Sequence, residues 1–222
     1  MWLGFQCDSR AVLRKHMWPT AGAGGIVGWQ LHERDPVFDD FRADVARVRA
    51  YGDKSSLPRL YFHHQGLWAC ACYRTGRWLY DHRPWPGVRH LILVFYHLWW
   101  KSIEVATGIS ISPDCRIGPG LYIGHFGGII LHPGVVMGAR CNLSQGVTLG
   151  LSCVDGKWGV PTVGDRVYIA PGAKVIGPIH LADGTVVGAN AVVTRSTEEN
   201  ATVVGVPARE INRRGSGEYI RG

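Results

Sequence analysis

Every sixth residue is apolar along most of the second half of the chain, and this spacing constrains the fold more than any other feature. At 46% apolar residues, chance would give such a run with a probability on the order of 10⁻⁴. A six-residue period suits a solenoid in which three short strands and tight turns make one coil, with a mostly β-branched residue filling the narrow interior. The thirteen positions are Ile111, Ile117, Ile123, Ile129, Val135, Cys141, Val147, Val163, Ile169, Val175, Leu181, Val187 and Val193.

The register of this repeat breaks once, between Val147 and Val163, which are sixteen residues apart. The extra residues predict a loop over 151–160 that leaves the coil. Loops extruded from a regular scaffold often carry function, and an insertion without a role is the alternative.

The first half of the chain predicts helices. An amphipathic helix begins at about Pro36, a second covers about residues 56–82, and a third covers about 88–107, with Gly108 as its stop. The aromatic stretch 95–100 in the third helix is expected to pack against other helices or another subunit, with a membrane surface as the alternative.

The composition changes near residue 107, since eight of the nine Trp lie before residue 101 and the glycine-rich repeat follows. The predicted organisation is an N-terminal extension (1–34), an α-helical domain (35–107), a β-helix (108–204) with its extruded loop (151–160), and a C-terminal cap and tail (205–222).

Several classes of protein are disfavoured. The longest apolar run, Leu91–Trp100, is too short to span a bilayer, and basic residues interrupt the N-terminal segment, so neither a transmembrane segment nor a signal peptide is expected. The six Cys form no C-x-x-C pair, which indicates reduced thiols in a cytoplasmic protein and no metal site. The net charge of +7 has no basic stripe with interleaved aromatics, so nucleic acid is not an expected partner.

The repeat resembles that of the hexapeptide-repeat acyltransferases, and the individual motifs resemble those of serine acetyltransferases over about residues 38–212. This resemblance implies a left-handed parallel β-helix preceded by an α-helical N-terminal domain. The matching stretches are Gly108–Pro113, Ile117–Gly128, Asn142–Gly150, Val167–Gly177, Val187–Val193 and Val204–Arg209, with Gln65–Ala69 and Tyr73–Trp78 in the helical half.

His125 is the best general base in the sequence. It stands in Gly124-His125-Phe126-Gly127-Gly128, where the glycines allow substrate and backbone to come close. The resemblance implies that His125 deprotonates an acceptor hydroxyl, which then attacks acetyl-CoA directly. A surface histidine at a turn is the alternative. No cysteine nucleophile is needed, and Cys141 occupies an inward position of the repeat.

The resemblance also implies the binding site of the acyl donor, acetyl-CoA. A basic residue near the C-terminus suits the phosphates of this donor, and Arg213 and Arg214 are candidates to assist it. The implied assembly is a homotrimer with sites between subunits, with a dimer of trimers as a further arrangement. The cofactor-binding residues are Gly150, Ala170, Pro171, Gly188, Ala189 and Arg209.

The chain departs from the serine acetyltransferase pattern around the acceptor. Ser110 replaces the aspartate that pairs with the base, so Asp114 or Glu104 is left as its orienting partner. Charged groups that would hold serine are also replaced, and each lost charge-assisted contact costs roughly 1.5–3 kcal/mol. These replacements are Ser112 for a histidine, Gly124 for an aspartate, and Gly159-Val160 for an Arg-His pair.

The acceptor is therefore expected to be serine or a similar small molecule, with a sugar, polysaccharide precursor or specialised metabolite as the alternative. A β-helical metal lyase like the γ-class carbonic anhydrases would need His125, His132 and His180 to converge, although they lack that family's close histidine pair. A non-enzymatic β-helix scaffold is the remaining alternative.

Overall fold

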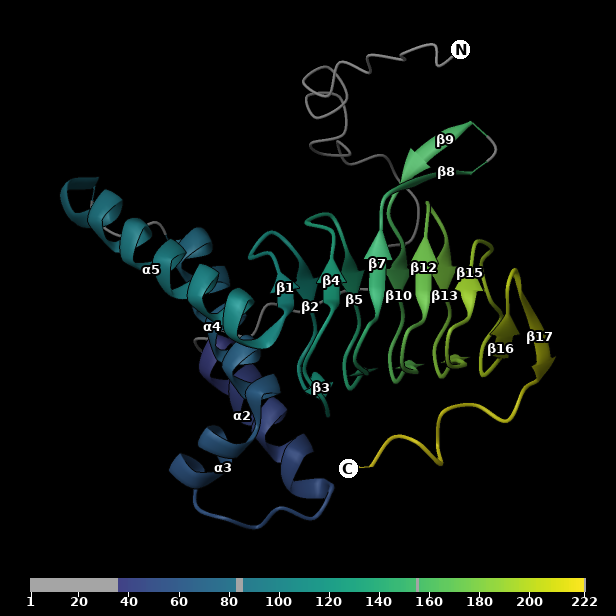
Figure 1. Cartoon of the computed structure of the whole chain (residues 1–222), viewed down its shortest axis with the longest axis horizontal. Coiled ribbons are helices and arrows are strands. Elements are labelled where there is room, and N and C mark those ends of the chain that lie inside the picture. The colour runs from purple at the N-terminus through teal and green to yellow at the C-terminus, as the bar shows by residue number, and fades with distance from the viewer. Residues whose placement is uncertain (1–35, 83–85, 155, 222) are drawn as a thin grey trace. The chain divides into compact units, whose positions relative to one another are not determined.

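A computed structural model describes residues 36–82, 86–154 and 156–221, which form four helices followed by a parallel β-helix (Figure 1). The predicted extension 1–34 and Cys7 lie outside the described residues. The fold class expected from the sequence is confirmed. The helices are α2 (Pro36–Ala50), α3 (Leu57–His63), α4 (Gln65–His82) and α5 (Pro86–Thr107).

The helix predicted over 56–82 is in fact two helices that meet at His64. His64 has an extended backbone and donates its N–H to the carbonyl of Leu60, which closes α3. Gly66 then lies so close to the carbonyl of Ile123 that a side chain there would clash with it. The interruption therefore lets α4 start directly against the first coil, a tertiary contact that helical periodicity does not reveal.

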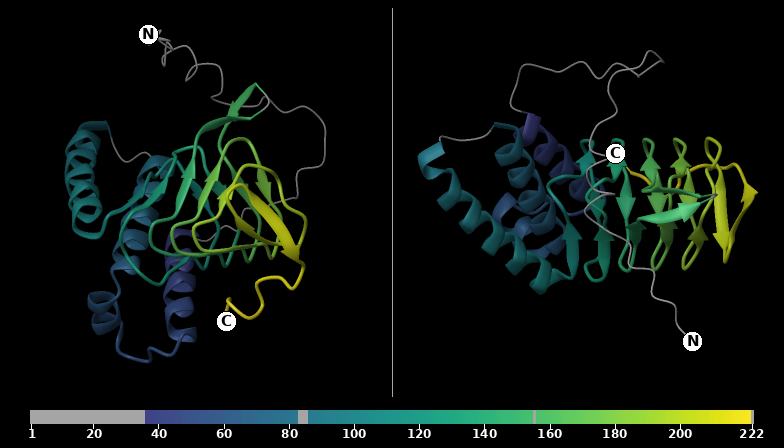
Figure 2. Two further views of the ribbon diagram at one scale, coloured as in Figure 1. Left: turned by 45° about the vertical axis from the view of Figure 1, so that its right-hand side comes forward. Right: turned by 90° about the horizontal axis from the view of Figure 1, so that it is seen from above.

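The strands stack into three parallel sheets that form the sides of the coils (Figure 2). Sheet A contains β1 (Ile109–Ile111), β4 (Ile129–Leu131), β7 (Thr148–Gly150), β12 (Lys174–Ile176) and β15 (Val192–Val193). Sheet B contains β2 (Arg116–Ile117), β5 (Val136–Met137), β10 (Thr162–Val163) and β13 (His180–Leu181). Sheet C contains β3 (Tyr122–Ile123), β6 (Asn142–Leu143), β11 (Tyr168–Ile169), β14 (Val186–Val187) and β16 (Thr202–Gly205), to which β17 (Ala208–Asn212) adds antiparallel.

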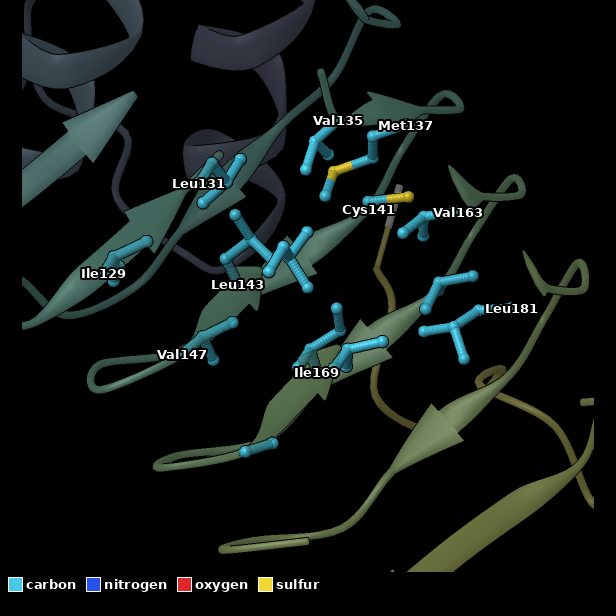
Figure 3. Close-up of a cluster of buried hydrophobic side chains, with 14 of the residues drawn as sticks. Ile129, Leu131, Val135, Met137, Cys141, Leu143, Val147, Val163, Ile169 and Leu181 are labelled. Atoms are coloured by element: carbon cyan, nitrogen blue, oxygen red, sulfur yellow. The ribbon is translucent and has the colours of Figure 1, made fainter. Parts of the chain in front are cut away.

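All thirteen repeat positions are buried. Figure 3 shows part of this interior, where Ile129, Val147 and Ile169 lie in the same cluster as Leu131 and Leu143. Each side of a coil contributes two inward residues that are two positions apart, such as Ile109 and Ile111. Apolar side chains therefore stack on one another from coil to coil, and each coil buries its core against its neighbours.

The prediction of a single register break is wrong, because a second break lies near the start of the β-helix. Ile111 pairs with Leu131, twenty residues on, whereas Leu131 pairs with Leu149, eighteen residues on. The two extra residues fall in the turn 124–128. The six-residue series hides this shift because each strand has two inward positions that lie two residues apart. A two-residue insertion moves the series from one of these positions to the other, so every sixth residue is still apolar.

The segment 151–160 holds an antiparallel hairpin of β8 (Ser152–Val154) and β9 (Lys157–Gly159), which projects from the coils (Figure 1). Trp158 on this hairpin is 56% exposed. The hairpin lengthens the spacing between Thr148 and its partner Lys174 to twenty-six residues without disturbing their parallel pairing.

A buried ion pair joins the helices to the first coil. The Arg74 guanidinium, on α4, donates Nε and Nη2 to the Asp44 carboxylate of α2, both at 3.0 Å, and Nη1 to Asp40 at 3.0 Å. It also donates to the carbonyls of Ile117 at 2.7 Å and Gly118 at 2.8 Å. Burial alone would lower the pKa of Arg74, but the two carboxylates outweigh it and hold that pKa above its usual value.

Helix α5 has one packed and one exposed apolar side. Tyr96 is buried in the helical cluster with Trp99 and Trp100 against it, as expected for this stretch, whereas Phe95 is 64% exposed. The remaining exposed apolar residues of this helix are Val88, Leu91, Val94, Leu98 and Val105. Within the described ranges, no helix combines the length and hydropathy needed to cross a membrane.

We predict that Arg74→Ala lowers the free energy of unfolding by about 3–5 kcal/mol, because it leaves the Asp44 carboxylate buried without its partner. Urea unfolding of the purified protein measures this. The double variant Arg74→Met/Asp44→Leu should lose less than the two single changes added together. A loss below about 1 kcal/mol for Arg74→Ala would show that the ion pair does not hold the helices to the coil.

A second prediction concerns the contact between coils at Gly138. A Cβ at this position would lie 2.7 Å from the carbonyl carbon of Gly164 in the next coil, so Gly138→Ala should destabilise the fold by about 1–3 kcal/mol. Gly87→Ala is the matched control, because nothing lies within 4 Å of its Cβ and alanine favours the helix. Equal thermal stability of the two variants would contradict this packing.

Candidate functional site

His125 lies on the surface directly after β3, at the corner where the chain passes from sheet C to sheet A (the C–A corner). Its turn is the one lengthened by two residues. Gly127 has a φ of +104°, and nothing lies within 4 Å of a Cβ placed there. The corner is therefore open around the imidazole, and a substrate can approach the ring from solvent.

The C–A corner repeats in successive coils, and backbone hydrogen bonds hold its turns in line. The Gly146 N–H donates to the Gly127 carbonyl at 2.8 Å, and the Gly172 N–H donates to the Gln145 carbonyl at 2.9 Å. The Asn190 N–H continues the series to the Pro171 carbonyl at 2.9 Å. At about 4.8 Å per coil, the turn after β14 lies three coils, or about 14 Å, from the turn of His125.

Four of the predicted donor-binding residues belong to this line of turns. Ala170 and Pro171 follow β11, and Gly188 and Ala189 follow β14, one coil further on. The structure thus places both pairs on the same corner as His125.

Arg209 extends the line and Gly150 does not. Arg209 lies on β17 opposite Val204, and a Cβ at Gly188 would lie 2.6 Å from a methyl group of Val204. The exposed guanidinium of Arg209 is therefore near the turn after β14. Gly150 is the last residue of β7 and lies at the corner between sheets A and B, where the hairpin begins.

The two other candidate arginines, Arg213 and Arg214, do not join this group. Arg213 donates Nε to Glu210 at 2.7 Å, which occupies its guanidinium. Arg214 lines a cavity at a different corner. Of the three arginines considered, only Arg209 reaches the C–A corner without a carboxylate partner among the described residues.

Two further side chains at the C–A corner, those of Lys174 and Gln145, were not predicted from the sequence as site residues. Lys174 donates Nζ to the Gly146 carbonyl at 2.6 Å and to Thr148 Oγ1 at 3.0 Å, so its charge lies next to the turn between His125 and Pro171. Gln145, in that turn, keeps its buried Oε1 without a partner in the described structure. Gln145 lies twenty residues after His125, just as Leu131 lies twenty after Ile111, so the eighteen-residue coil expected from the six-residue period does not point to it.

Neither candidate partner of His125 makes a hydrogen bond with it in the described structure. Asp114 lies at another corner, next to Ser112, whose Oγ donates to its carboxylate at 3.3 Å. Glu104 is closer in the fold, because its carbonyl accepts the N–H of Gly108, which abuts the backbone of the His125 turn. Hydrogen bonds from Lys101 and, to a smaller extent, Ser110 lower the pKa of Glu104.

The cysteines near the coils are poorly suited to nucleophilic chemistry. Burial raises the pKa of both Cys115 and Cys141 to about 12, so their thiols stay protonated at neutral pH. Cys153 is exposed on the hairpin, away from the C–A corner.

The other two histidines of the β-helix, His132 and His180, have structural partners. His132 accepts the Gly134 N–H at 3.2 Å, and burial lowers its pKa. His180 lies 3.0 Å from Thr162 Oγ1. In the part of the chain that the structure describes, no three His, Cys, Asp or Glu side chains gather as a metal site would require.

The positions where the serine acetyltransferase pattern would place charged groups are neutral. Gly159 packs against the ring of Pro178, and a Cβ there would lie 2.6 Å from Pro178 Cβ. Val160 is half-buried and packs on the core of the β-helix. Gly124 faces the ring of Tyr122. Gly124 therefore brings no charge to the C–A corner, and Gly159 and Val160 bring none to the base of the hairpin.

The chain matches known proteins along most of its length. Residues 161–195 match the family model described as bacterial transferase hexapeptide (six repeats). A serine acetyltransferase of Mycobacterium tuberculosis is 36% identical over 174 residues, which cover 78% of this chain and 71% of that relative. A serine acetyltransferase of Synechococcus elongatus is 35% identical over 152 residues, 68% of this chain and 59% of that relative.

Solved structures agree with these relatives. The crystal structure of serine acetyltransferase from Brucella abortus has a TM-score of 0.66 at 28% identity and covers 82% of this chain and 71% of its own. The enzyme from Vibrio cholerae has a TM-score of 0.68 at 26% identity, covering 82% and 68%. With more than two thirds of the mycobacterial relative matched at 36% identity, the chain belongs to the serine acetyltransferase family.

Proposed function

We propose that this protein transfers an acetyl group from acetyl-CoA to the hydroxyl of serine or a similar small acceptor. Family membership supports the reaction class. Solved relatives include a serine acetyltransferase in complex with coenzyme A from Brucella abortus and one in complex with serine from Neisseria gonorrhoeae. The chain spans 59% of the Synechococcus relative, so its own activity is inferred.

The observation that carries the proposal is the alignment of functional groups along one corner of the β-helix. His125 stands at the start of this line, the turns of Pro171 and Ala189 follow, and Arg209 stands near its far end. Acetyl-CoA is long and thin, with its thioester at one end and its phosphates at the other. The line offers a base for the thioester end and a guanidinium for a phosphate.

The residues suggest a direct transfer without a covalent enzyme intermediate. His125 accepts the proton of the acceptor hydroxyl while that oxygen attacks the thioester carbonyl carbon. The tetrahedral intermediate then collapses, the carbon–sulfur bond breaks, and His125 returns the proton to the departing thiolate. Backbone N–H groups at the corner are candidates to bind the oxyanion. The products are an acetyl ester and free CoA.

A sugar or another polyol is the second candidate acceptor. The neutral surroundings of Gly124, Gly159 and Val160 favour it, because they lack the charges that would fix the ammonium and carboxylate of serine. Hydroxyl-rich acceptors need hydrogen-bonding groups rather than fixed charges. From the family resemblance we also propose a cytoplasmic homotrimer, with a dimer of trimers as its extension.

His125→Ala should reduce kcat for acetyl transfer by about 10²–10⁴-fold, because the base is removed from the reacting hydroxyl. Release of CoA, followed with a thiol reagent, measures this over a panel of L-serine, L-homoserine, sugars and sugar nucleotides. CoA affinity, measured separately by calorimetry, should stay within about twofold of the parent protein. Full activity of His125→Ala with any acceptor would exclude His125 as the base, and failure of the parent protein to bind CoA would favour a scaffold.

Arg209→Gln should raise the KM for acetyl-CoA by about tenfold and leave kcat nearly unchanged, because it removes a charge-assisted contact far from the reacting bond. Arg59→Gln is the matched control, since it removes an exposed guanidinium from α3. Equal KM values for the two variants would place the CoA phosphates elsewhere.

A further inference from the structure

A cavity of about 330 Å³ lies at a second corner of the β-helix, where the chain passes from sheet B to sheet C (the B–C corner). After β17 the C-terminal segment returns alongside the coils (Figure 1). Its residues 214–217 line part of the cavity. His125 and its line of turns belong to the C–A corner, so this cavity is a separate feature. Its polar lining residues are Arg166, Asp183, Glu199, Asn200, Arg214 and Ser216.

The floor of the cavity is formed by stacked turns with left-handed backbones. Arg166, Gly184 and Asn200 occupy equivalent positions in three successive coils, with φ values of 54°, 70° and 60°. The Gly184 N–H donates to the Asp165 carbonyl at 2.9 Å, and the Asn200 N–H donates to the Asp183 carbonyl at 2.9 Å. A Cβ at Gly184 would collide with the Asn200 side chain, so glycine lets the Asn200 amide pack directly against this turn on the floor of the cavity.

The wall supplied by the C-terminal segment is fixed by its own hydrogen bonds. The Gly215 N–H donates to the Asn200 carbonyl at 2.9 Å, and Ser216 Oγ donates to the Arg166 carbonyl at 2.5 Å. Tyr219 then stacks on Tyr168, with ring centroids 4.7 Å apart. Arg214 is thus held at the rim by a docked segment.

The charges around the cavity are balanced but not paired with one another. In the described parts of the chain, the guanidinium groups of Arg166 and Arg214 make no ion pair or hydrogen bond, and neither does the Glu199 carboxylate. Asp183 uses one carboxylate oxygen to accept the Asp165 N–H at 2.8 Å. Two cations and two anions therefore face one hollow, while the neighbouring Arg213 is already paired with Glu210.

We propose that this cavity binds a free α-amino acid. The guanidinium groups of Arg166 and Arg214 receive its carboxylate, and the carboxylates of Asp183 and Glu199 receive its ammonium. A lining with two charges of each sign matches a zwitterion, whereas a simple anion or cation would leave one pair of charges unmatched. The volume lies near the lower limit of about 300 Å³ for small-molecule pockets, which suits a ligand of this size.

The test uses amino acids that have no hydroxyl and so cannot accept an acetyl group. L-alanine, L-valine and L-glutamate are titrated into the full-length protein without acetyl-CoA, by calorimetry and by thermal unfolding. For the one that binds most tightly, Arg214→Gln and Arg166→Gln should each weaken binding by about tenfold or more. Arg213→Gln, the matched control, should bind within about twofold of the parent protein. The amide and the N-acetyl derivative, which lack one charge each, should bind about tenfold more weakly.

Three results would overturn the site. The first is that none of the three amino acids binds or raises the unfolding temperature. The second is that Arg213→Gln weakens binding as much as Arg214→Gln does. The third is that His125→Ala abolishes binding while both cavity variants retain it, which would place the amino acid at the C–A corner. None of these measurements requires catalysis. The proposal of an amino-acid site can therefore be refuted while the proposed acetyl transfer is confirmed, and the reverse is equally possible.

Discussion

The backbone hydrogen bonds between coils are the interaction on which the rest of this structure depends. Each short strand pairs in parallel with the strand one coil away, and these pairings set both the spacing and the alignment of the turns. The apolar interior fills the space that they enclose. Because the turns are held in line, side chains separated by about twenty residues in sequence become neighbours along one edge. Both ligand sites that we propose use such an edge.

The solenoid needs its ends covered, and the two ends are covered differently. At the start, the buried Arg74–Asp44 ion pair joins two helices to backbone carbonyls and one N–H of the first coil. The helices therefore cover the end of the β-helix that has no preceding coil to pack against. At the finish, β17 turns back antiparallel on β16 and stops the parallel stacking. The segment after β17 then returns along sheet C, and its Tyr219 carbonyl accepts a hydrogen bond from Tyr51 beside α2.

The sequence predicted the coil architecture because its period reports directly on the interior, and it predicted the surroundings of His125 because glycine marks an open turn. It missed the second register break, since a slip of two residues leaves an apolar side chain at every sixth position. It missed the interruption at His64 because the contact of Gly66 with Ile123 lies in the tertiary structure. The sequence also did not predict the B–C cavity. Arg166 and Arg214 line it together only because the coils stack and the C-terminal segment returns alongside them.

The two-residue lengthening of the His125 turn shows how such a fold can vary its chemistry without altering its interior. Along a strand, side chains alternate between inside and outside, so adding two residues preserves that parity and Ile129 still enters the core. Adding one residue would reverse it unless the turn absorbed the change. A corner of a β-helix can therefore change in length by two residues while the same faces of the flanking strands stay in the core.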